Sequence, residues 1–117
     1  MPLSLHRDLI RTRNFIGGHW VTSTGGTFTV RDPANENTIA EVADSEERDA
    51  KAAIDAAYAA LPSWRGAPAR TRAQVLKRWH TVIVQHQEDL ARLISREQGK
   101  PLAEARGQAA GERDDAL

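Results

Sequence analysis

The chain has 117 residues, enough for one small domain, and its 16 basic and 16 acidic side chains give a formal net charge of zero. A balanced charge argues against a nucleic-acid-binding protein, which would carry a basic excess or a basic stripe. The sequence contains no cysteine, which excludes disulfides, thiolate metal sites and cysteine nucleophiles from this chain.

The N-terminal segment, residues 1–13, has Leu5 and Leu9 or Ile10 at helical spacing and predicts a short helix. Its arginines accompany no apolar h-region, so we expect no secretory signal peptide, and Asp8 counts against the alternative of a short transit peptide. No apolar run approaches the roughly 20 residues that span a bilayer. We therefore expect a soluble, cytoplasmic protein. Arginine supplies most of the basic side chains, which suggests a bacterial source.

Residues 14–43 predict a small antiparallel β-meander. Gly17-Gly18 separates two short β-prone runs, which is typical of a tight hairpin because glycine adopts positive φ without a steric penalty. Asp32–Asn37 has the composition of a turn, with Pro33 fixing its own φ. The four predicted strands are Asn14–Ile16, His19–Val21, Thr27–Val30 and Thr38–Val42.

Residues 44–106 predict the helical part of the chain. Asp44 with Glu47 has the spacing of a capping box, so a first helix is expected to run from residue 44 to about residue 61. Pro62 is expected to end it, and Trp64 is expected to fill the gap before the next helix. The apolar positions of this helix repeat at helical spacing but are mostly alanine.

A second helix is predicted over about residues 69–98, with a consistent apolar face. Gly99-Lys100-Pro101 is a helix stop, and a third helix could begin in residues 102–106. Residues 107–117 have little to bury and predict a disordered tail. The apolar face consists of Val75, Leu76, Trp79, Val82, Ile83, Leu90, Leu93 and Ile94.

The predicted fold class is therefore an α+β fragment, a β-meander followed by two long helices. Hydrophobic residues make up 40% of the chain and aromatic residues 5%. Because much of that apolar fraction is alanine, which buries little area, we expect a weak independent folder.

Residue types alone predict no catalytic, cofactor-binding or metal-binding site. His80 and His86 are six residues apart and do not share a helix face, and the other two histidines, His6 and His19, lie elsewhere. The adjacent acids of Glu88-Asp89 and Asp114-Asp115 diverge, so neither pair can share a proton. Gly99-Lys100 lacks the rest of a phosphate loop. The remaining candidates fit turns or solvated surfaces: Gly17-Gly18, Gly25-Gly26, Arg70, Arg72 and Arg78.

Several linked blocks nevertheless resemble, in order, the N-terminal part of the aldehyde dehydrogenase superfamily. Glu97-Gln98-Gly99-Lys100-Pro101-Leu102-Ala103-Glu104-Ala105 is most similar to succinate-semialdehyde dehydrogenases. The resemblance covers about residues 8–106, after which the chain departs from the family. The other blocks are Phe15–Trp20, Asp32–Asn35, Ala52–Ala57, Leu61–Arg65, Arg70–Arg72 with Leu76 and Trp79, and Gln85–Ile94.

The resemblance implies the start of the family's cofactor domain, within an enzyme that oxidises an aldehyde with NAD or NADP. In such an enzyme a cysteine thiolate holds the aldehyde, a glutamate acts as base and an asparagine stabilises the oxyanion. For the most similar members the reaction converts succinate semialdehyde to succinate in 4-aminobutyrate degradation. All these groups lie beyond the matched stretch, so none is assigned here and the chain alone is expected to be inactive.

The resemblance also implies partners and one weak site. The expected partner is the remainder of an aldehyde dehydrogenase, or a second copy bound through exposed helix faces, with neither nucleic acid nor membrane. Some members bind a monovalent cation through backbone oxygens near the residue that Glu97 matches. The alternative interpretation is a stand-alone helical interaction module that uses the exposed face of residues 50–61.

Overall fold

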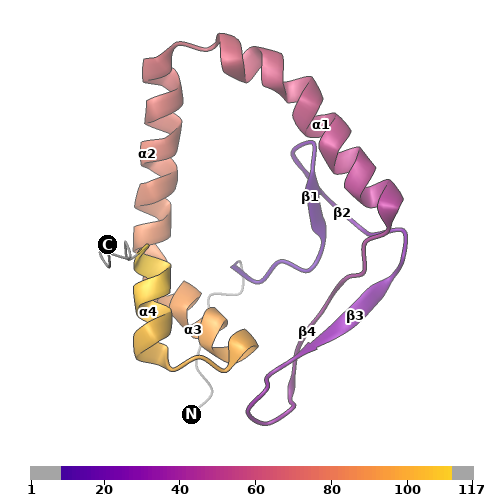
Figure 1. The fold of residues 1–117 in the computed structure, drawn as a ribbon, viewed down its shortest axis with the longest axis vertical. Coiled ribbons are helices and arrows are strands. Elements are labelled where there is room, and N and C mark those ends of the chain that lie inside the picture. Colours follow the sequence, from indigo (N-terminus) through magenta and orange to yellow (C-terminus); the bar gives the residue numbers. More distant parts are fainter. Residues whose placement is uncertain (1–8, 112–117) are drawn as a thin grey trace, which may run out of the picture. The chain divides into compact units, whose positions relative to one another are not determined.

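The computed structural model describes residues 9–111, and the expected α+β class is confirmed (Figure 1). Most of the predicted N-terminal helix and the last six residues of the predicted tail lie outside the described residues. Within the described residues, no helix is long and apolar enough to cross a membrane. The elements are β1 Asn14–Ile16, β2 His19–Val21, β3 Thr27–Arg31, β4 Thr38–Ala43, α1 Glu47–Gly66, α2 Ala69–Gln85, α3 Gln87–Gln98 and α4 Leu102–Ala110.

The chain divides into two compact units. One unit consists of Arg11–Val30 and Ala40–Leu76. It contains β1, β2, most of β3 and β4, α1 and the first half of α2. The described part of the other unit contains residues 9–10, the hairpin segment Arg31–Ile39, and the chain from Lys77 to Gly111. Each unit is therefore considered by itself.

The first hairpin forms as the glycine pair predicts. Phe15 of β1 pairs with Trp20 of β2, and their ring centroids lie 4.9 Å apart. Gly17 and Gly18 have φ of 60° and 82°, values that a residue with a Cβ adopts at a cost. The guanidinium of Arg11 lies 4.9 Å from the Trp20 ring centroid, a cation–π contact.

The predicted single meander is wrong, because the four strands form two separate two-stranded sheets, β1–β2 and β3–β4. The loop between β2 and β3, which turns at Thr24-Gly25, is hydrogen-bonded to α1. Both the backbone N–H of Thr24 (3.0 Å) and its hydroxyl (2.9 Å) donate to the carboxylate of Asp49 in α1. β3 follows this anchored loop and pairs with β4, not with β2.

Asp49 also sets where α1 begins. Its carboxylate accepts the backbone N–H of Glu46 at 2.8 Å, so Glu46 is the N-cap and the predicted cap at Asp44 is two residues too early. Only 7% of Asp49 is exposed. The bonds from the Glu46 and Thr24 backbone amides hold the pKa of this carboxyl below its ordinary value.

α1 continues past Pro62 to Gly66, which contradicts the expected end at about residue 61. Proline lacks only its own N–H, so one bond to the carbonyl of Tyr58 is lost while later amides can still donate. Trp64 consequently lies inside the helix and is 40% exposed, so the predicted role of filling an interhelical gap is wrong.

The predicted long helix is interrupted at His86, which has φ −106° and ψ 14°. Its N–H contacts the carbonyls of both Val82 (3.2 Å) and Ile83 (3.1 Å), and its own carbonyl accepts from Leu90 to start α3. The sequence contains one sign of this interruption, the seven-residue gap in the predicted apolar face between Ile83 and Leu90. The interruption separates α2 from α3, which packs against α4.

α3 and α4 pack through small side chains. Ala91 of α3 and Ala105 of α4 are fully buried, and Gly107 is buried as well. Two bonds of 2.9 Å from the Arg106 guanidinium to the Glu88 carboxylate connect the same helices. α4 runs to Ala110, so the predicted tail is wrong for residues 107–110. A buried glycine permits close helix contact that a sequence-based helix propensity does not count.

The helix stop at Gly99-Lys100-Pro101 is confirmed. Gly99 has φ 70° and donates its N–H to the carbonyl of Ser95 at 2.9 Å. The Ser95 hydroxyl donates to the carbonyl of Lys100 at 2.7 Å, which closes the turn before α4. A Cβ on Gly99 would lie 3.1 Å from Cγ of Pro33 in the β3–β4 hairpin.

Gly99→Ala is expected to destabilise the chain more than Gly111→Ala. Both glycines end helices at positive φ, 70° and 68°, so each substitution carries the left-handed cost of about 1–2 kcal/mol. Only Gly99 adds a tight contact, 3.1 Å from Cγ of Pro33, since none of the described residues lies within 4 Å of a Cβ on Gly111. Urea unfolding followed by far-UV circular dichroism measures the two effects. Equal losses would show that the Pro33 contact contributes nothing.

Asp49→Asn is expected to lower the urea midpoint at neutral pH. The folded pKa of Asp49 is depressed, so its stabilising contribution is present above the unfolded pKa of about 3.9 and is lost as pH falls through the folded value. The difference between wild type and Asp49→Asn should therefore shrink on acidification. Asp55→Asn, at an exposed position of α1, is the matched control and should change little. A difference that persists unchanged below the folded pKa would contradict this assignment.

Candidate functional site

Within residues 9–111, the candidate side chains named above come from several different elements. His19 and His80 are exposed on β2 and α2, and His86 lies at the α2–α3 junction. Within residues 9–111 there is no group of three His, Cys, Asp or Glu residues that could hold a metal ion. His6, Asp114 and Asp115 lie outside the described residues. The geometry therefore offers no metal centre in this part of the chain.

Glu88 has a structural role and is not a member of a proton-sharing pair. Its two carboxylate oxygens each accept from Arg106 at 2.9 Å, and Nε of Arg92 lies 3.6 Å from one of them. The hydrogen bonds from Arg106 hold the pKa of Glu88 below its ordinary value, so it stays ionised. The same contact raises the pKa of Arg106. An ionised, engaged carboxylate is a poor proton donor.

Lys100 and Glu97 flank the turn before α4. The ammonium of Lys100 donates to the side-chain oxygen of Gln108 in α4 at 2.7 Å. This contact is structural and does not resemble a phosphate loop. Glu97 is exposed in the last turn of α3, two residues before the left-handed Gly99. The weak cation site at Glu97 stays a prediction. Of the arginines considered, Arg70 and Arg78 are exposed and Arg72 is half-buried.

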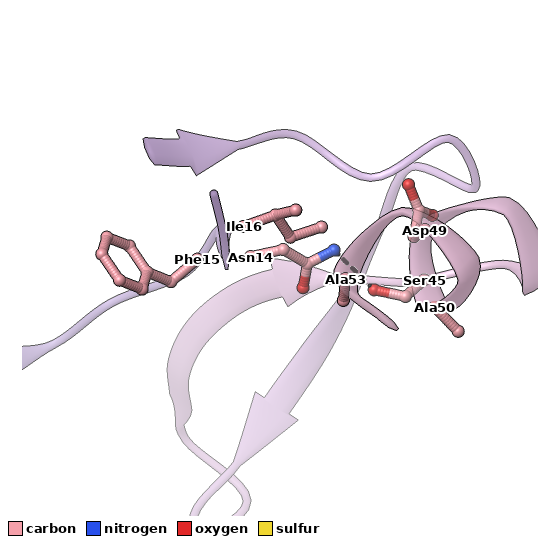
Figure 2. A pocket seen from close by; sticks show the side chains of 7 residues that line it. All are labelled: Asn14, Phe15, Ile16, Ser45, Asp49, Ala50 and Ala53. Atoms are coloured by element: carbon pink, nitrogen blue, oxygen red, sulfur yellow. Dashed lines mark hydrogen bonds between the residues drawn. The ribbon is translucent and has the colours of Figure 1, made fainter. Parts of the chain in front are cut away.

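A cavity of about 210 Å³ opens between β1 and the start of α1 (Figure 2). Asn14 donates to the Ser45 hydroxyl at 2.7 Å across one side of it. Sequence patterns did not reveal this hollow, because its walls come from segments about 30 residues apart. Its lining residues are Asn14, Phe15, Ile16, Ser45, Asp49, Ala50 and Ala53.

The cavity lacks the parts of a catalytic centre. Ser45 is hydrogen-bonded to an amide, which cannot take its proton as a base would. Asp49 is bound by Thr24 and Glu46 and held ionised, so it is not poised near neutral pH. The apolar wall, from Ile16 to Ala53, suits a hydrophobic side chain better than a reacting group.

The most distinctive surface is the outer side of α1. The inner side of α1, which faces the β1–β2 hairpin, carries the small or buried residues Asp49, Ala53 and Ala56. A Cβ added to Gly17 of the hairpin turn would lie 3.9 Å from Cβ of Ala56. The large apolar side chains of Ile54, Tyr58 and Leu61 lie on the other side and are 67%, 77% and 43% exposed. An amphipathic helix with a single partner would turn these side chains toward that partner.

α2 carries a second exposed apolar row. The predicted face has the right period, but Val75, Leu76, Trp79 and Val82 are exposed, with Trp79 at 64%. Only Ile83 is half-buried. A contiguous row of large apolar side chains in solvent marks an interaction surface. The exposed large apolar side chains are therefore Ile54, Tyr58 and Leu61 on α1 and Val75, Leu76, Trp79 and Val82 on α2.

Comparisons with known proteins match this chain to one family. The model of the aldehyde dehydrogenase family matches residues 20–114. The match continues beyond Arg106, so the expected departure from the family at that point is wrong. The physical reason is α4, which continues to Ala110 as an ordered helix.

The chain is similar to several succinate-semialdehyde dehydrogenases. It is 45% identical over 104 residues to the mitochondrial enzyme of Hylobates lar, covering 89% of this chain and 19% of that protein. It is 43% identical over 102 residues to the NADP(+) enzyme of Escherichia coli K12, covering 86% of this chain and 21% of that protein. The chain thus spans about a fifth of the length of the curated relatives it matches.

Comparison with solved structures gives the same result as comparison of sequences. The chain superposes on an E. coli NADP-dependent enzyme with a TM-score of 0.86 and 42% identity, covering 90% of this chain and 22% of that one. A succinate-semialdehyde dehydrogenase from Burkholderia pseudomallei gives a TM-score of 0.86 and 39% identity, with the same coverages of 90% and 22%. With the family match over residues 20–114, these likenesses show that the chain belongs to the aldehyde dehydrogenase family.

Proposed function

We propose that the chain is the N-terminal part of an NAD(P)-dependent aldehyde dehydrogenase that oxidises succinate semialdehyde to succinate. The observation that supports the proposal most is that the first seven similar proteins are all succinate-semialdehyde dehydrogenases. Mitochondrial succinate-semialdehyde dehydrogenases from primates and rodents are 41–45% identical to it, and the E. coli enzyme is 43% identical. Each similarity extends over most of this chain, so it does not rest on one short block.

A second substrate has support of its own. The chain is 42% identical to a 3-sulfolactaldehyde dehydrogenase of Pseudomonas putida, almost the same value as for the E. coli enzyme. Succinate semialdehyde and sulfolactaldehyde both combine an aldehyde with an anionic group, a carboxylate or a sulfonate. The proposal for the whole enzyme is therefore a small anionic aldehyde, with succinate semialdehyde favoured by the larger number of similar relatives.

The proposed cofactor of the whole enzyme is NAD or NADP. The E. coli relative is named for NADP(+), and a structural neighbour is a complex with nicotinamide adenine dinucleotide. This segment itself does not fit a dinucleotide site. Helix N-termini bind phosphates by their free N–H groups, but the start of α1 after β4 carries Glu46, Glu47 and Asp49, which repel an anion.

We further propose that the chain alone is inactive. The reaction class requires a thiolate nucleophile, and no cysteine is present in the 117 residues. The contribution of this segment is structural: the β1–β2 hairpin, α1 and the α3–α4 pair form a scaffold. A cytoplasmic location stays a prediction, since the similar enzymes include mitochondrial ones.

The alternative, a stand-alone interaction module, differs in its expected stability. A complete module has a covered core, whereas the described residues contain only two fully buried hydrophobic side chains, Ala91 and Ala105. Large apolar side chains such as Trp79 are exposed. The uncovered surface favours the proposal of a part of a larger enzyme.

A full-length chimera tests the proposed function. The segment of the E. coli enzyme that matches this chain is replaced by the matching residues of this chain, and reduction of NADP+ is followed with succinate semialdehyde. The chimera should be active, because 43% identity and the shared backbone preserve the packing positions. The isolated chain should give no signal above a blank. A soluble but inactive chimera, or turnover by the isolated chain, would contradict the proposal.

The isolated chain is expected to bind a hydrophobic dye and to melt over a broad temperature range. Large apolar side chains on α1 and α2 are exposed, and the buried core of residues 9–111 is too small for a cooperative transition. Trp79→Ser should reduce dye fluorescence with little change in helicity, because Trp79 is exposed. His80→Ser, at the next and also exposed position, is the control. A sharp monomeric transition without dye binding would favour the interaction module instead.

A further inference from the structure

The loop between β2 and β3 is bonded at two points to the segment that leads from β4 into α1. The backbone N–H of Thr24 donates to the Asp49 carboxylate at 3.0 Å, and the Thr24 hydroxyl donates to it at 2.9 Å. Two residues further on, the carbonyl of Gly26 accepts the backbone N–H of Asp44 at 2.9 Å. All these groups belong to one compact unit. We call residues 24–26 the strap.

Gly25, at the centre of the strap, approaches this segment so closely that no side chain fits. A Cβ built on Gly25 would lie 2.4 Å from the backbone carbonyl oxygen of Asp44 and 3.0 Å from Cγ of Glu46. Glu46 can move its flexible side chain, but a backbone carbonyl moves only with the chain. Gly25 does not have the left-handed φ of Gly26, 82°, so glycine is needed here for space.

The strap and the cap of α1 use the same carboxylate. Asp49 accepts the backbone N–H of Glu46 at 2.8 Å in addition to the two bonds from Thr24. The Thr24 hydroxyl also lies 3.1 Å from a carboxylate oxygen of Glu46, which is the N-cap residue. A buried carboxylate that loses donors is destabilised, and Asp49 is buried. The strap and the helix cap therefore stabilise each other.

We propose that the strap and the first turn of α1 form one conformational unit, which opens and closes as a whole while the rest of the chain stays folded. The bonds join the same two short segments, so the loss of one bond weakens the hold of the others. Gly25 is the residue that permits closure. Because Ser45, Asp49 and Ala50 also line the cavity beside β1, opening of the strap removes one wall of that cavity.

Amide hydrogen exchange of the 117-residue chain, followed residue by residue by NMR, tests this proposal. The reporters of the unit are the backbone N–H groups of Thr24, Asp44 and Glu46, which are bonded within it. The reporters outside it are the backbone N–H groups of Leu90 in α3 and Ala105 in α4. A unit that opens as a whole gives its three reporters the same response to any substitution that weakens it.

Gly25→Ala should lower the protection of Thr24, Asp44 and Glu46 by a common factor of at least about tenfold, because its Cβ has no room beside the Asp44 carbonyl. Thr24→Val removes the hydroxyl donor and keeps the side-chain volume. It should lower all three by a smaller common factor, including Asp44, to which the Thr24 side chain is not bonded. Gly66→Ala in the same unit is the matched control, since no other described part of the chain lies within 4 Å of a Cβ there.

Equal factors at the three reporters, with Leu90 and Ala105 unchanged, support the proposal. A fall at only one or two of the three reporters shows that the bonds break independently and overturns it. Unchanged protection in Gly25→Ala overturns it as well, since closure then does not depend on that glycine. If Gly25→Ala unfolds the whole chain, Thr24→Val decides: an equal fall at Leu90 and Ala105 in that variant shows that the strap has no opening of its own.

Discussion

The carboxylate of Asp49 is the contact on which the N-terminal unit depends. It accepts from the backbone of Glu46 and from the backbone and hydroxyl of Thr24, so one side chain both starts α1 and anchors the loop after β2. That loop is held on α1, and β3 after it pairs with β4, so two sheets form in place of one. The small residues of the inner side of α1 then leave room for the β1–β2 hairpin.

The sequence predicts the elements better than their ends. The Gly17-Gly18 hairpin and the stop at Gly99 were readable because each depends on neighbouring residues. The predicted capping box of Asp44 with Glu47 was two residues too early, because Glu46 and Asp49 form the box and the Asp49 carboxylate also accepts from Thr24, 25 residues away in sequence. Similarly, α4 extends through Gly107 because it packs against α3, a tertiary contact that no local propensity records.

For the candidate site too, the sequence predicts what depends on composition and period and misses what depends on tertiary contacts. Composition alone predicts no thiolate nucleophile in this chain, and the family expected from the ordered blocks is confirmed by the match over residues 20–114. Helical period correctly placed Val75, Leu76, Trp79 and Val82 on one face. Period cannot say whether a face is covered, since coverage depends on what packs on it. The two sides of α1 are distinguished only by the fold, in which the hairpin turn lies close to Ala56 while Ile54 is exposed.

The exposed row on α1 and α2 has a consequence for synthesis. Under the proposed function, about four-fifths of the enzyme lies outside this segment, and most of it is made after the segment. At about 5–20 residues per second, Tyr58 and Trp79 face water for tens of seconds before their partner exists. Apolar side chains in that state are what chaperones bind. Under the proposed function, these exposed side chains are therefore the part of the nascent segment where chaperone binding is expected.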